Sequence, residues 1–151
     1  MRVLIQRVKQ ARVEVDGQTV GEIQHGLLAF VGLAKHDNEQ VSEKALKKIL
    51  AYRIFEDPAS KDNAGRMNLN LAQVNGGLLL VSQFTLMAET RKGLRPDFGL
   101  AMPPDQAREL FDKMVITAKA LYSTVATGQF GANMQVSLVN DGPVTFMLEV
   151  E

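Results

Sequence analysis

Two uninterrupted apolar segments constrain the fold of this chain more than any other feature. The first covers residues 27–33, and the second begins with the run Leu-Leu-Leu-Val at 78–81, from which we predict a strand over 78–84. A strand with one face in solvent alternates apolar and polar residues, whereas continuous apolar runs are typical of strands covered on both faces. The rest of the chain must therefore supply layers for both faces of a sheet.

Two segments predict the helices that cover one of these faces. The first is 39–52, preceded by Asp37 or Asn38 as its N-cap, with apolar residues at helical spacing and lysines toward water. The second begins at Pro104, a residue that suits the first helical turn. We predict that it runs to about Thr127 and that Gly128 ends it.

The remaining segments predict further strands and two loops. Alternating or β-branched residues indicate strands at 3–15, 19–23, 134–138 and 144–150, and polar stretches rich in Gly and Pro indicate loops at 56–70 and 89–104. No repeat or linker divides the chain. We therefore predict one domain over residues 1–151, of the α/β class, strand-rich and layered α/β/β, with two main helices covering one face of a sheet.

Composition excludes several classes of function. The 17 basic and 17 acidic side chains balance, so any polyanion must be bound by a local patch. Cysteine is absent and histidine occurs only at positions 25 and 36, so we expect no disulfide, no metal site and no cofactor. The N-terminus is too charged for a signal peptide and no apolar run reaches membrane length, so we expect a cytoplasmic protein without membrane contact.

Residues 140–145 (Asn-Asp-Gly-Pro-Val-Thr) separate the last two predicted strands. A hairpin turn is the ordinary interpretation, because Asp and Gly accept the positive φ that tight turns require. Pro143 has no N–H for a ladder and so also allows an edge or a bulge. A Gly-Pro bond adopts the cis form more readily than other bonds, and a cis Gly142-Pro143 bond would offer two rigid carbonyl acceptors.

Two further segments carry side chains suited to a binding site. Ser82, Gln83 and Thr85 end the second apolar segment beside a Gly/Pro-rich loop, where they could face a cleft that has Phe84 as an aromatic wall. Alternatively, the hydroxyls only satisfy backbone groups at the strand end. The small residues of 128–132, around Phe130, either allow close approach of a ligand or cap a helix.

Together these segments resemble the signatures of the D-aminoacyl-tRNA deacylases, the D-Tyr-tRNA deacylase family. The similar stretches follow one another along the whole chain, at 6–8, 65–68, 82–86, 92–98, 128–132 and 140–145. Two positions depart from the family pattern: Arg66 stands where lysine is common, and Asp97 stands where serine is common. Both lie in predicted loops, so neither changes the assignment.

The resemblance implies an enzyme that hydrolyses the ester joining a D-amino acid to the terminal ribose of tRNA, and also glycine mischarged on tRNA-Ala. It implies a homodimer in which a cis Gly142-Pro143 pair reaches into the partner's pocket. There its carbonyls hold the α-amino side of the substrate and leave no room for an L side chain. The resemblance assigns the catalytic floor of the pocket to Ser82, Gln83, Phe84 and Thr85, with Phe130 and Ala132 nearby.

Within this assignment, we hypothesise that Thr85 is not an obligatory nucleophile, because no residue is evident that would deprotonate it. Water would be activated with help from the substrate's own ribose hydroxyl. Ser82 and Gln83 would bind the ribose or adenine, and backbone N–H groups near Phe84 would stabilise the oxyanion. For tRNA, the candidate contacts are Arg91, Lys92 and Arg95, whose alternative interpretation is a solvated loop.

Two other functions remain open from the sequence. The chain could be a non-catalytic nucleic-acid-binding dimer of the same fold, or an esterase for another small acyl ester that ignores tRNA. A binding protein has no need for both the 82–85 and the 142–143 segments, and a stronger basic surplus would be expected of it.

Overall fold

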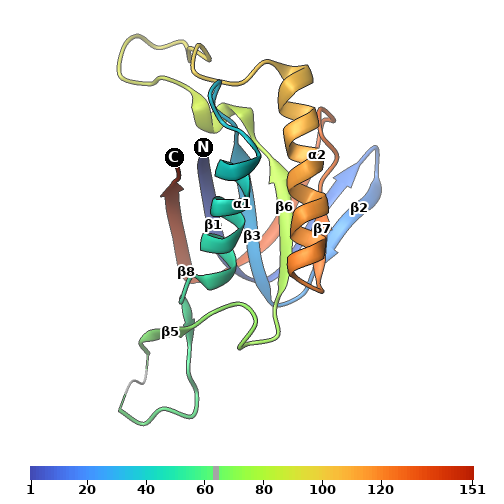
Figure 1. Ribbon diagram of the computed structural model, residues 1–151. Helices are drawn as coiled ribbons and strands as arrows, with labels where there is room; N and C mark the ends of the chain where they lie inside the picture. The colour runs from blue at the N-terminus through green and yellow to red at the C-terminus, as the bar shows by residue number, and fades with distance from the viewer. Residues whose placement is uncertain (63–64) are drawn as a thin grey trace.

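The computed structural model describes residues 1–62 and 65–151, and a mixed sheet lies at its centre (Figure 1). Its strands are β1 (Arg2–Val15), β2 (Gln18–Ile23), β3 (Gly26–Gly32), β6 (Gly77–Ser82), β7 (Val125–Thr127) and β8 (Gln135–Glu149). They are ordered β2-β1-β3-β6-β7, while β8 pairs with β1 along nearly its whole length. Because β1 is so long, it pairs with β3 through its first half and with β2 through its second.

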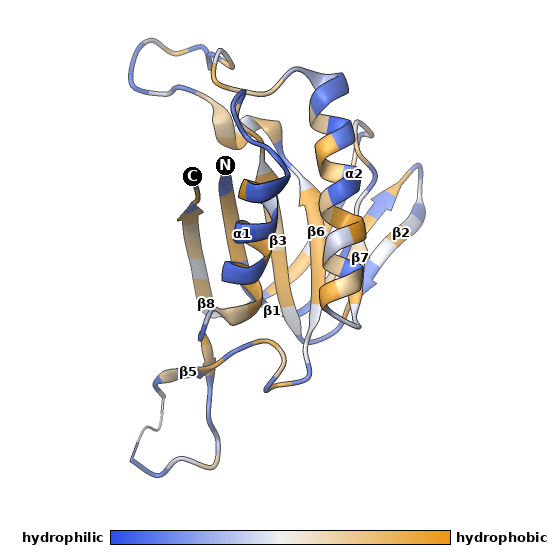
Figure 2. Ribbon diagram, viewed as in Figure 1, coloured by the Kyte–Doolittle hydropathy of each residue, from blue (hydrophilic) through white to orange (hydrophobic). Residues whose placement is uncertain are grey.

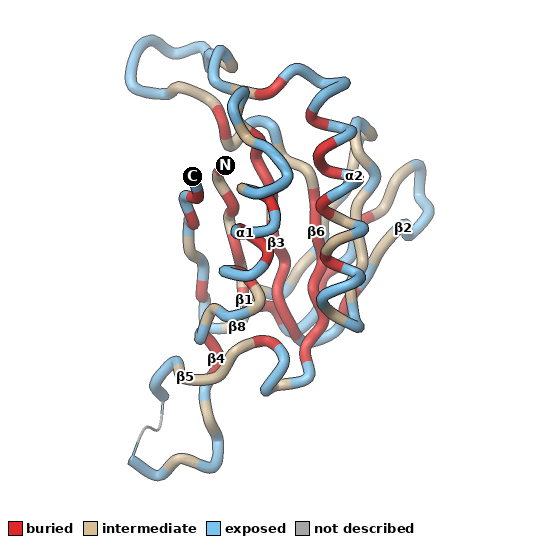
Figure 3. The backbone as a smooth tube through the Cα atoms, viewed as in Figure 1, coloured by how far each residue is buried: buried red, intermediate tan, exposed pale blue. Residues whose placement is uncertain are grey.

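The two apolar segments form the neighbouring parallel strands β3 and β6, in a register that places Leu27 beside Leu78 and Val31 beside Ser82. They are buried along most of their length, as the red tubes in Figure 3 show. One face is covered by helices. The other packs into a second cluster closed by β1, β2 and β8: Val8, Ala11, Val13, Ile23, Leu28, Leu79 and Val81. The prediction of an α/β fold whose central strands are covered on both faces is confirmed.

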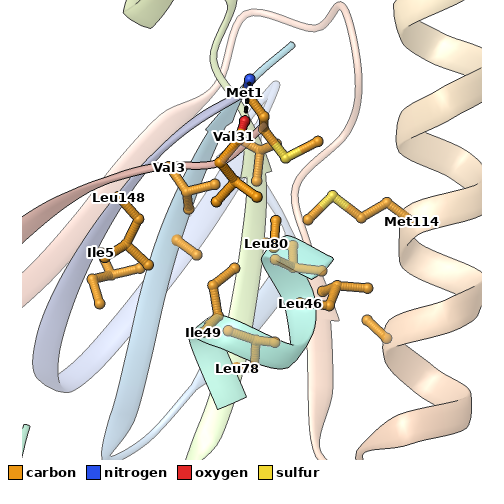
Figure 4. Packing of buried hydrophobic residues seen from close by; sticks show 14 of the residues in the cluster. Met1, Val3, Ile5, Val31, Leu46, Ile49, Leu78, Leu80, Met114 and Leu148 are labelled. Atoms are coloured by element: carbon orange, nitrogen blue, oxygen red, sulfur yellow. Dashed lines mark hydrogen bonds between the residues drawn. The ribbon is translucent and has the colours of Figure 1, made fainter. Parts of the chain in front are cut away.

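The helices α1 (Glu39–Ala51) and α2 (Pro104–Leu121) lie side by side on one face of the sheet. Asn38, not Asp37, caps α1 by accepting a 3.0 Å hydrogen bond from the Val41 N–H. Leu46 and Ile49 of α1, with Met114 of α2, pack against Leu78 and Leu80 (Figure 4). The outward faces of the helices are largely hydrophilic (Figure 2).

An exposed ion-pair cluster joins the two helices on the side away from the sheet. The ammonium of Lys113 in α2 lies 2.7 Å from the Glu39 carboxylate of α1 and 3.0 Å from that of Glu109. The hydrogen bonds to Glu39 and Glu109 raise the pKa of Lys113 above its usual value. No helix within the described ranges is long and apolar enough to cross a membrane.

The prediction that the second helix reaches Thr127 is wrong. The helix ends at Leu121, because Tyr122 turns to an extended conformation and its partly buried hydroxyl donates a hydrogen bond to the Gly76 carbonyl. The same burial raises the pKa of Tyr122. Residues 125–127 then pair with β6 as strand β7, with Thr127 beside Leu80. Two β-branched residues suit this strand, and Gly128 follows a strand and not a helix.

At 140–145 the hairpin interpretation is wrong, and the bulge that Pro143 also allowed is present. Both halves of β8 pair with β1, so the chain does not reverse there. Asn140 lies opposite Val8 and Thr145 opposite Gln6, which is a step of five residues on β8 against two on β1. Residues 141–144, called the bulge below, therefore protrude from a continuous strand. Pro143 fits this arrangement because a residue in a bulge does not need to donate a backbone N–H to the neighbouring strand.

Three short elements complete the described fold. The second apolar strand ends at Ser82, two residues earlier than predicted, and a 3₁₀ helix η1 (Phe84–Met87) follows Gln83. In the segment predicted as a loop at 56–70, β5 (Met67–Leu69) pairs with β4 (Phe55–Glu56). These two strands form the base of an arm, described at residues 53–62 and 65–69, which projects from the end of the molecule opposite to loop 89–102 (Figure 1).

Candidate functional site

Residues 82–85, called the strand-end segment below, lie at the edge of the sheet where β6 stops. The Gln83 N–H donates a 2.8 Å hydrogen bond to the Val31 carbonyl of β3, and this bond fixes the chain as it leaves the sheet. Arg2 of β1 donates a 3.0 Å bond to the Leu86 carbonyl and so holds η1 over the sheet edge. Ser82 and Gln83 are half-buried, whereas Phe84 and Thr85 are exposed.

The polar groups of this segment point to binding and not to nucleophilic attack. The Gln83 side-chain amide donates a hydrogen bond to the Thr85 hydroxyl oxygen. Within residues 1–62 and 65–151, no carboxylate or imidazole bonds to that hydroxyl, and no hydrogen bond is donated by the backbone N–H groups of Phe84 and Thr85. The first N–H groups of a helix lack internal partners, so these two amides can donate to a ligand.

The segment 128–132 lies beside the strand-end segment, as a shared site requires. The Gly128 N–H donates a 2.9 Å hydrogen bond to the Leu80 carbonyl, which aligns this segment with the end of β6. The Phe130 ring is half-buried against Phe111 of α2, at 6.0 Å, and lies under the Arg108 guanidinium at 4.9 Å. Ala132 closes a turn by donating to the Gln129 carbonyl. Phe130 is therefore held by α2 and contributes only part of its surface to a pocket.

Loop 89–102 carries the three predicted tRNA contacts at the same end of the sheet. Its neck is closed by a 2.8 Å hydrogen bond from the Glu89 N–H to the Asp97 carbonyl. The Phe98 ring packs at a tilt of 59° against the exposed Phe84 ring, with 4.9 Å between the ring centroids, so the loop touches the strand-end segment. Arg91, Lys92 and Arg95 are all exposed, and the only ion pair among them in the described chain is the 3.9 Å contact of Arg91 with Glu89.

The bulge is held from both sides by hydrogen bonds. Arg7, only 7% exposed, donates from Nε to the Asp141 carbonyl at 3.1 Å and lies 3.5 Å from the Asp141 carboxylate. The Asn140 amide nitrogen donates two 2.9 Å bonds, to the carbonyls of Arg7 and Val144. Gly142 and Pro143 themselves are exposed, and the peptide bond between them is cis.

One chain does not bring the strand-end segment and the bulge together. Ser82 is level with Val31 of β3 and hence with Val3 of β1, whereas the bulge lies opposite Arg7 on the far edge of β1. The two segments are therefore separated by four residues along the strands, which span about 14 Å, and by three strand spacings across the sheet, which also span about 14 Å. Together these displacements place the strand-end segment and the bulge about 20 Å apart. In a single chain, loop 89–102 contacts the strand-end segment through Phe98, and the segment of Phe130 and Ala132 follows Gly128 at the end of β6, whereas Gly142 and Pro143 lie apart from both.

Surface cavities do not identify the site. One cavity, of about 190 Å³, lies between β1, β2 and β8 near Ala11, Ile23 and Leu138. Another, of about 230 Å³, lies between the first turns of α1 and α2. Neither includes a residue of the strand-end segment or the bulge. Within the described residues, no three His, Cys, Asp or Glu side chains gather as metal ligands would.

Arg7 and Asn140 are supporting residues whose roles the sequence did not reveal. A signal for Arg7 was present, because it follows Val3 and Ile5 at the spacing of inward-pointing strand residues. A charged residue on the buried face of a strand must find a partner, and here it holds the bulge. Asn140 belongs to the motif, but its two-sided bonding depends on β1 and is not visible in the local sequence.

Comparison with known proteins agrees with the resemblance found in the sequence. The profile of the family described as D-Tyr-tRNA(Tyr) deacylase matches residues 4–149. A D-aminoacyl-tRNA deacylase of Acinetobacter baumannii (strain ACICU) is 58% identical over the whole chain and 99% of its own length. One from Psychrobacter cryohalolentis is 59% identical over 99% of both chains.

Solved structures give the same fold. A structure titled c-Myc DNA Unwinding Element Binding Protein superposes with a TM-score of 0.91 at 36% identity, covering 99% of this chain and 98% of its own. A probable eukaryotic D-amino acid tRNA deacylase reaches 0.81 at 17% identity over 97% of both chains, which supports the fold alone. The family match and the identities along the entire length show that the chain belongs to the D-Tyr-tRNA(Tyr) deacylase family.

Proposed function

We propose that this protein, as a D-aminoacyl-tRNA deacylase, hydrolyses the ester of D-aminoacyl-tRNA in pockets that two copies of the chain build together. The strand-end segment of one subunit forms the floor of each pocket, and Gly142 and Pro143 of the other subunit complete it. The observation that carries this proposal is the separation of about 20 Å between the strand-end segment and the bulge of one chain. The strand register imposes this distance, because the two segments lie four residues apart along the strands and three strand spacings apart across the sheet.

The chemistry follows from the groups that each half presents. The free N–H groups of Phe84 and Thr85 are placed to receive the charge that develops on the ester oxygen as water attacks. Ser82 and Gln83, half-buried at the sheet edge, bind the ribose or adenine. Thr85 binds and does not attack, because its hydroxyl oxygen already accepts from the Gln83 amide and has no base beside it.

Chirality is selected by the bulge. An enzyme for many D-amino acids must bind the part that they share, and the carbonyls of Gly142 and Pro143 are fixed acceptors for an α-amino group. An L side chain would be directed into this fixed backbone and would clash, which rejects it more strongly than weaker attraction does. Glycine has no side chain to clash, so glycyl-tRNA mischarged on tRNA-Ala is also a substrate. Arg91, Lys92 and Arg95 bind the phosphates of tRNA.

Mixing two inactive variants tests the shared pocket. Gly142→Val removes the bulge function, and Ser82→Ala with Gln83→Ala removes the floor. A heterodimer of the two carries one pocket with both halves intact, so subunit exchange should restore about a quarter of the wild-type rate of D-Tyr-tRNA hydrolysis. Failure to recover any activity, although exchange is confirmed by mass, would place each pocket within one chain.

The non-catalytic alternative is kept because the neighbour that superposes at 0.91 is titled a DNA-binding protein. For this chain, that alternative predicts DNA or tRNA binding without release of the amino acid. Incubation of the protein with D-Tyr-tRNA distinguishes the two, since only the deacylase yields free D-tyrosine.

A further inference from the structure

The arm, described at residues 53–62 and 65–69, is joined firmly to the body of the protein. Its root is buried: Ile54 and Phe55 are each 2% exposed, and the Phe55 ring meets His25 edge-on at 5.2 Å. Arg53 joins the two legs by donating to the backbone carbonyl of Asn68 at 2.6 Å and to its side-chain oxygen. The base of the arm therefore has a defined direction and does not swing freely.

Arg7 connects the root of this arm to the bulge. Its Nη1 donates a 2.8 Å hydrogen bond to the Ile54 carbonyl, while its Nε donates to the Asp141 carbonyl at 3.1 Å. One buried guanidinium thus holds both segments through its rigid, planar set of donors. The arm and the bulge form a single unit, and wherever the bulge is inserted, the arm accompanies it.

Within one chain the arm cannot reach loop 89–102, because the two project from opposite ends of the sheet (Figure 1). In the dimer proposed above, however, the bulge of one subunit enters the pocket of the other, and loop 89–102 flanks that pocket through the contact of Phe98 with Phe84. We propose that the arm of each subunit packs against loop 89–102 of its partner, so that both chains form the mouth of each pocket. This inference rests on the proposed function.

The outer leg of the arm and loop 89–102 carry opposite charges, while over the whole arm three acidic residues are balanced by Arg53, Lys61 and Arg66. The outer leg of the arm, residues 56–62, carries Glu56, Asp57 and Asp62 against one lysine, while loop 89–102 carries Arg91, Lys92 and Arg95 against two acids. Exposed ion pairs contribute little energy, but they select orientation. A negative outer leg also favours a basic protein loop over tRNA as its neighbour.

Both segments also expose a large apolar side chain. Met67 on the arm is 45% exposed, and Leu94 on the loop is fully exposed in the single chain. A contact between the segments would bury both. It would also restrict the loop that carries the proposed tRNA-binding cations, so the arm would order the partner's loop before tRNA arrives.

Cysteine cross-linking tests the arrangement cleanly, because the chain has no cysteine of its own. A variant with Met67→Cys and Leu94→Cys is treated with a short bifunctional maleimide at low protein concentration and run on a denaturing gel. Most of the protein should migrate as a covalent dimer. Three controls should stay mainly monomeric: each single-cysteine variant, and Val20→Cys with Leu94→Cys, since Val20 is similarly exposed on β2 away from the arm.

Size-exclusion chromatography and D-Tyr-tRNA hydrolysis by the same double variant separate the possible failures. If the variant elutes as a dimer and hydrolyses the substrate but does not cross-link beyond the controls, the arm proposal is overturned and the shared pocket survives. If the unmodified protein elutes as a monomer or leaves D-Tyr-tRNA intact, the proposed function fails and the arm proposal falls with it.

Discussion

The strand-end segment and the bulge are the two halves of the candidate site, and they are built in opposite ways. The bulge is held by the buried Arg7 and by Asn140, which donate hydrogen bonds to the Asp141 and Val144 carbonyls. Asn140 also donates to the Arg7 carbonyl, and Arg7 also donates to the Ile54 carbonyl at the root of the arm. The strand-end segment has mostly backbone support, and Phe84 is 59% exposed. The bulge is therefore fixed by side-chain hydrogen bonds, whereas the strand-end segment remains exposed to solvent.

This difference matches the two tasks that the proposed function assigns to the two halves. Excluding an L side chain requires a rigid surface, so the bulge needs supporting contacts that keep its backbone in place. The half that receives the ester and the terminal nucleotide must admit a large substrate, and it remains accessible. Changes to the supports of the bulge should therefore alter selectivity, whereas changes around the strand-end segment should alter rate or affinity.

The largest effect is expected from Gly142→Ala. Gly142 has φ +130°, and a Cβ there would lie 2.7 Å from the Val144 Cγ2, so the bulge must shift. Because a displacement of about 1 Å in a positioning group can cost about 100-fold, single-turnover hydrolysis of D-Tyr-tRNA should fall by about that factor. Gly17→Ala is the matched control: it has positive φ (+76°) but open space around its Cβ, far from the site, and it should keep the wild-type rate.

Arg7→Ala should lower both stability and selectivity. The change removes the buried donor that satisfies the carbonyls of Ile54 and Asp141, at a cost of about 3 kcal/mol in the free energy of unfolding measured with urea. The ratio of D-Tyr-tRNA to L-Tyr-tRNA hydrolysis should fall in the surviving folded protein. An unchanged ratio would show that the bulge keeps its position without Arg7.

Asn140→Asp should act on the same half with a smaller loss. The replacement keeps the size of the side chain but removes the amide group that donates to the carbonyls of Arg7 and Val144. The free energy of unfolding should therefore fall by about 1–3 kcal/mol. Thr145→Val removes the 3.3 Å bond that the hydroxyl donates to the Asn140 oxygen and the 3.1 Å bond that it accepts from the Gln6 amide; both are exposed, so the cost should be smaller, about 1 kcal/mol. Equal D/L ratios in both variants and the wild type would contradict the role given to Asn140.

Thr85→Val tests the open half. Since Thr85 has no neighbouring base among the described residues, the variant should retain hydrolysis within about tenfold of wild type, far from the roughly million-fold loss that removal of a true nucleophile causes. Rapid-quench analysis of a single turnover should reveal no acyl-enzyme. Trapping an acyl group on Thr85 would refute this interpretation.

The smallest effects should come from Arg91→Ala and Lys92→Ala. Each removes one exposed cation, so tRNA affinity should weaken and the slope of log affinity against log salt should decrease by about one for each phosphate that the loop no longer binds. The D/L ratio should not change, because neither residue touches the bulge. A weakening of affinity that is independent of salt would argue against phosphate binding by these residues.

Local features of the sequence were sufficient for much of this structure. The apolar runs predicted the central strands, although the second strand ends at Ser82, two residues before its predicted end. The end of α2 was missed because residues 122–127 can continue a helix locally, and the choice depends on pairing with β6 and on the Gly76 carbonyl. Such contacts come from residues about 50 positions away.

The bulge shows the same limit. Asp-Gly between two alternating runs predicts a hairpin locally, but β1 is long enough to pair with both runs, and this non-local ladder decides the fold. The inward position of Arg7 signalled a partner without identifying it. The separation of the two halves became visible only with the strand order, and the proposal of a site shared between chains rests on it.

Chiral hydrolysis is tested most directly by comparing D-Tyr-tRNA and L-Tyr-tRNA as substrates of the wild-type protein, with a chelator present throughout. Selection by a fixed bulge predicts rapid release of tyrosine from the D-ester and no release from the L-ester above the spontaneous rate. Equal release from both esters would contradict that selection, and release from neither would contradict the reaction itself.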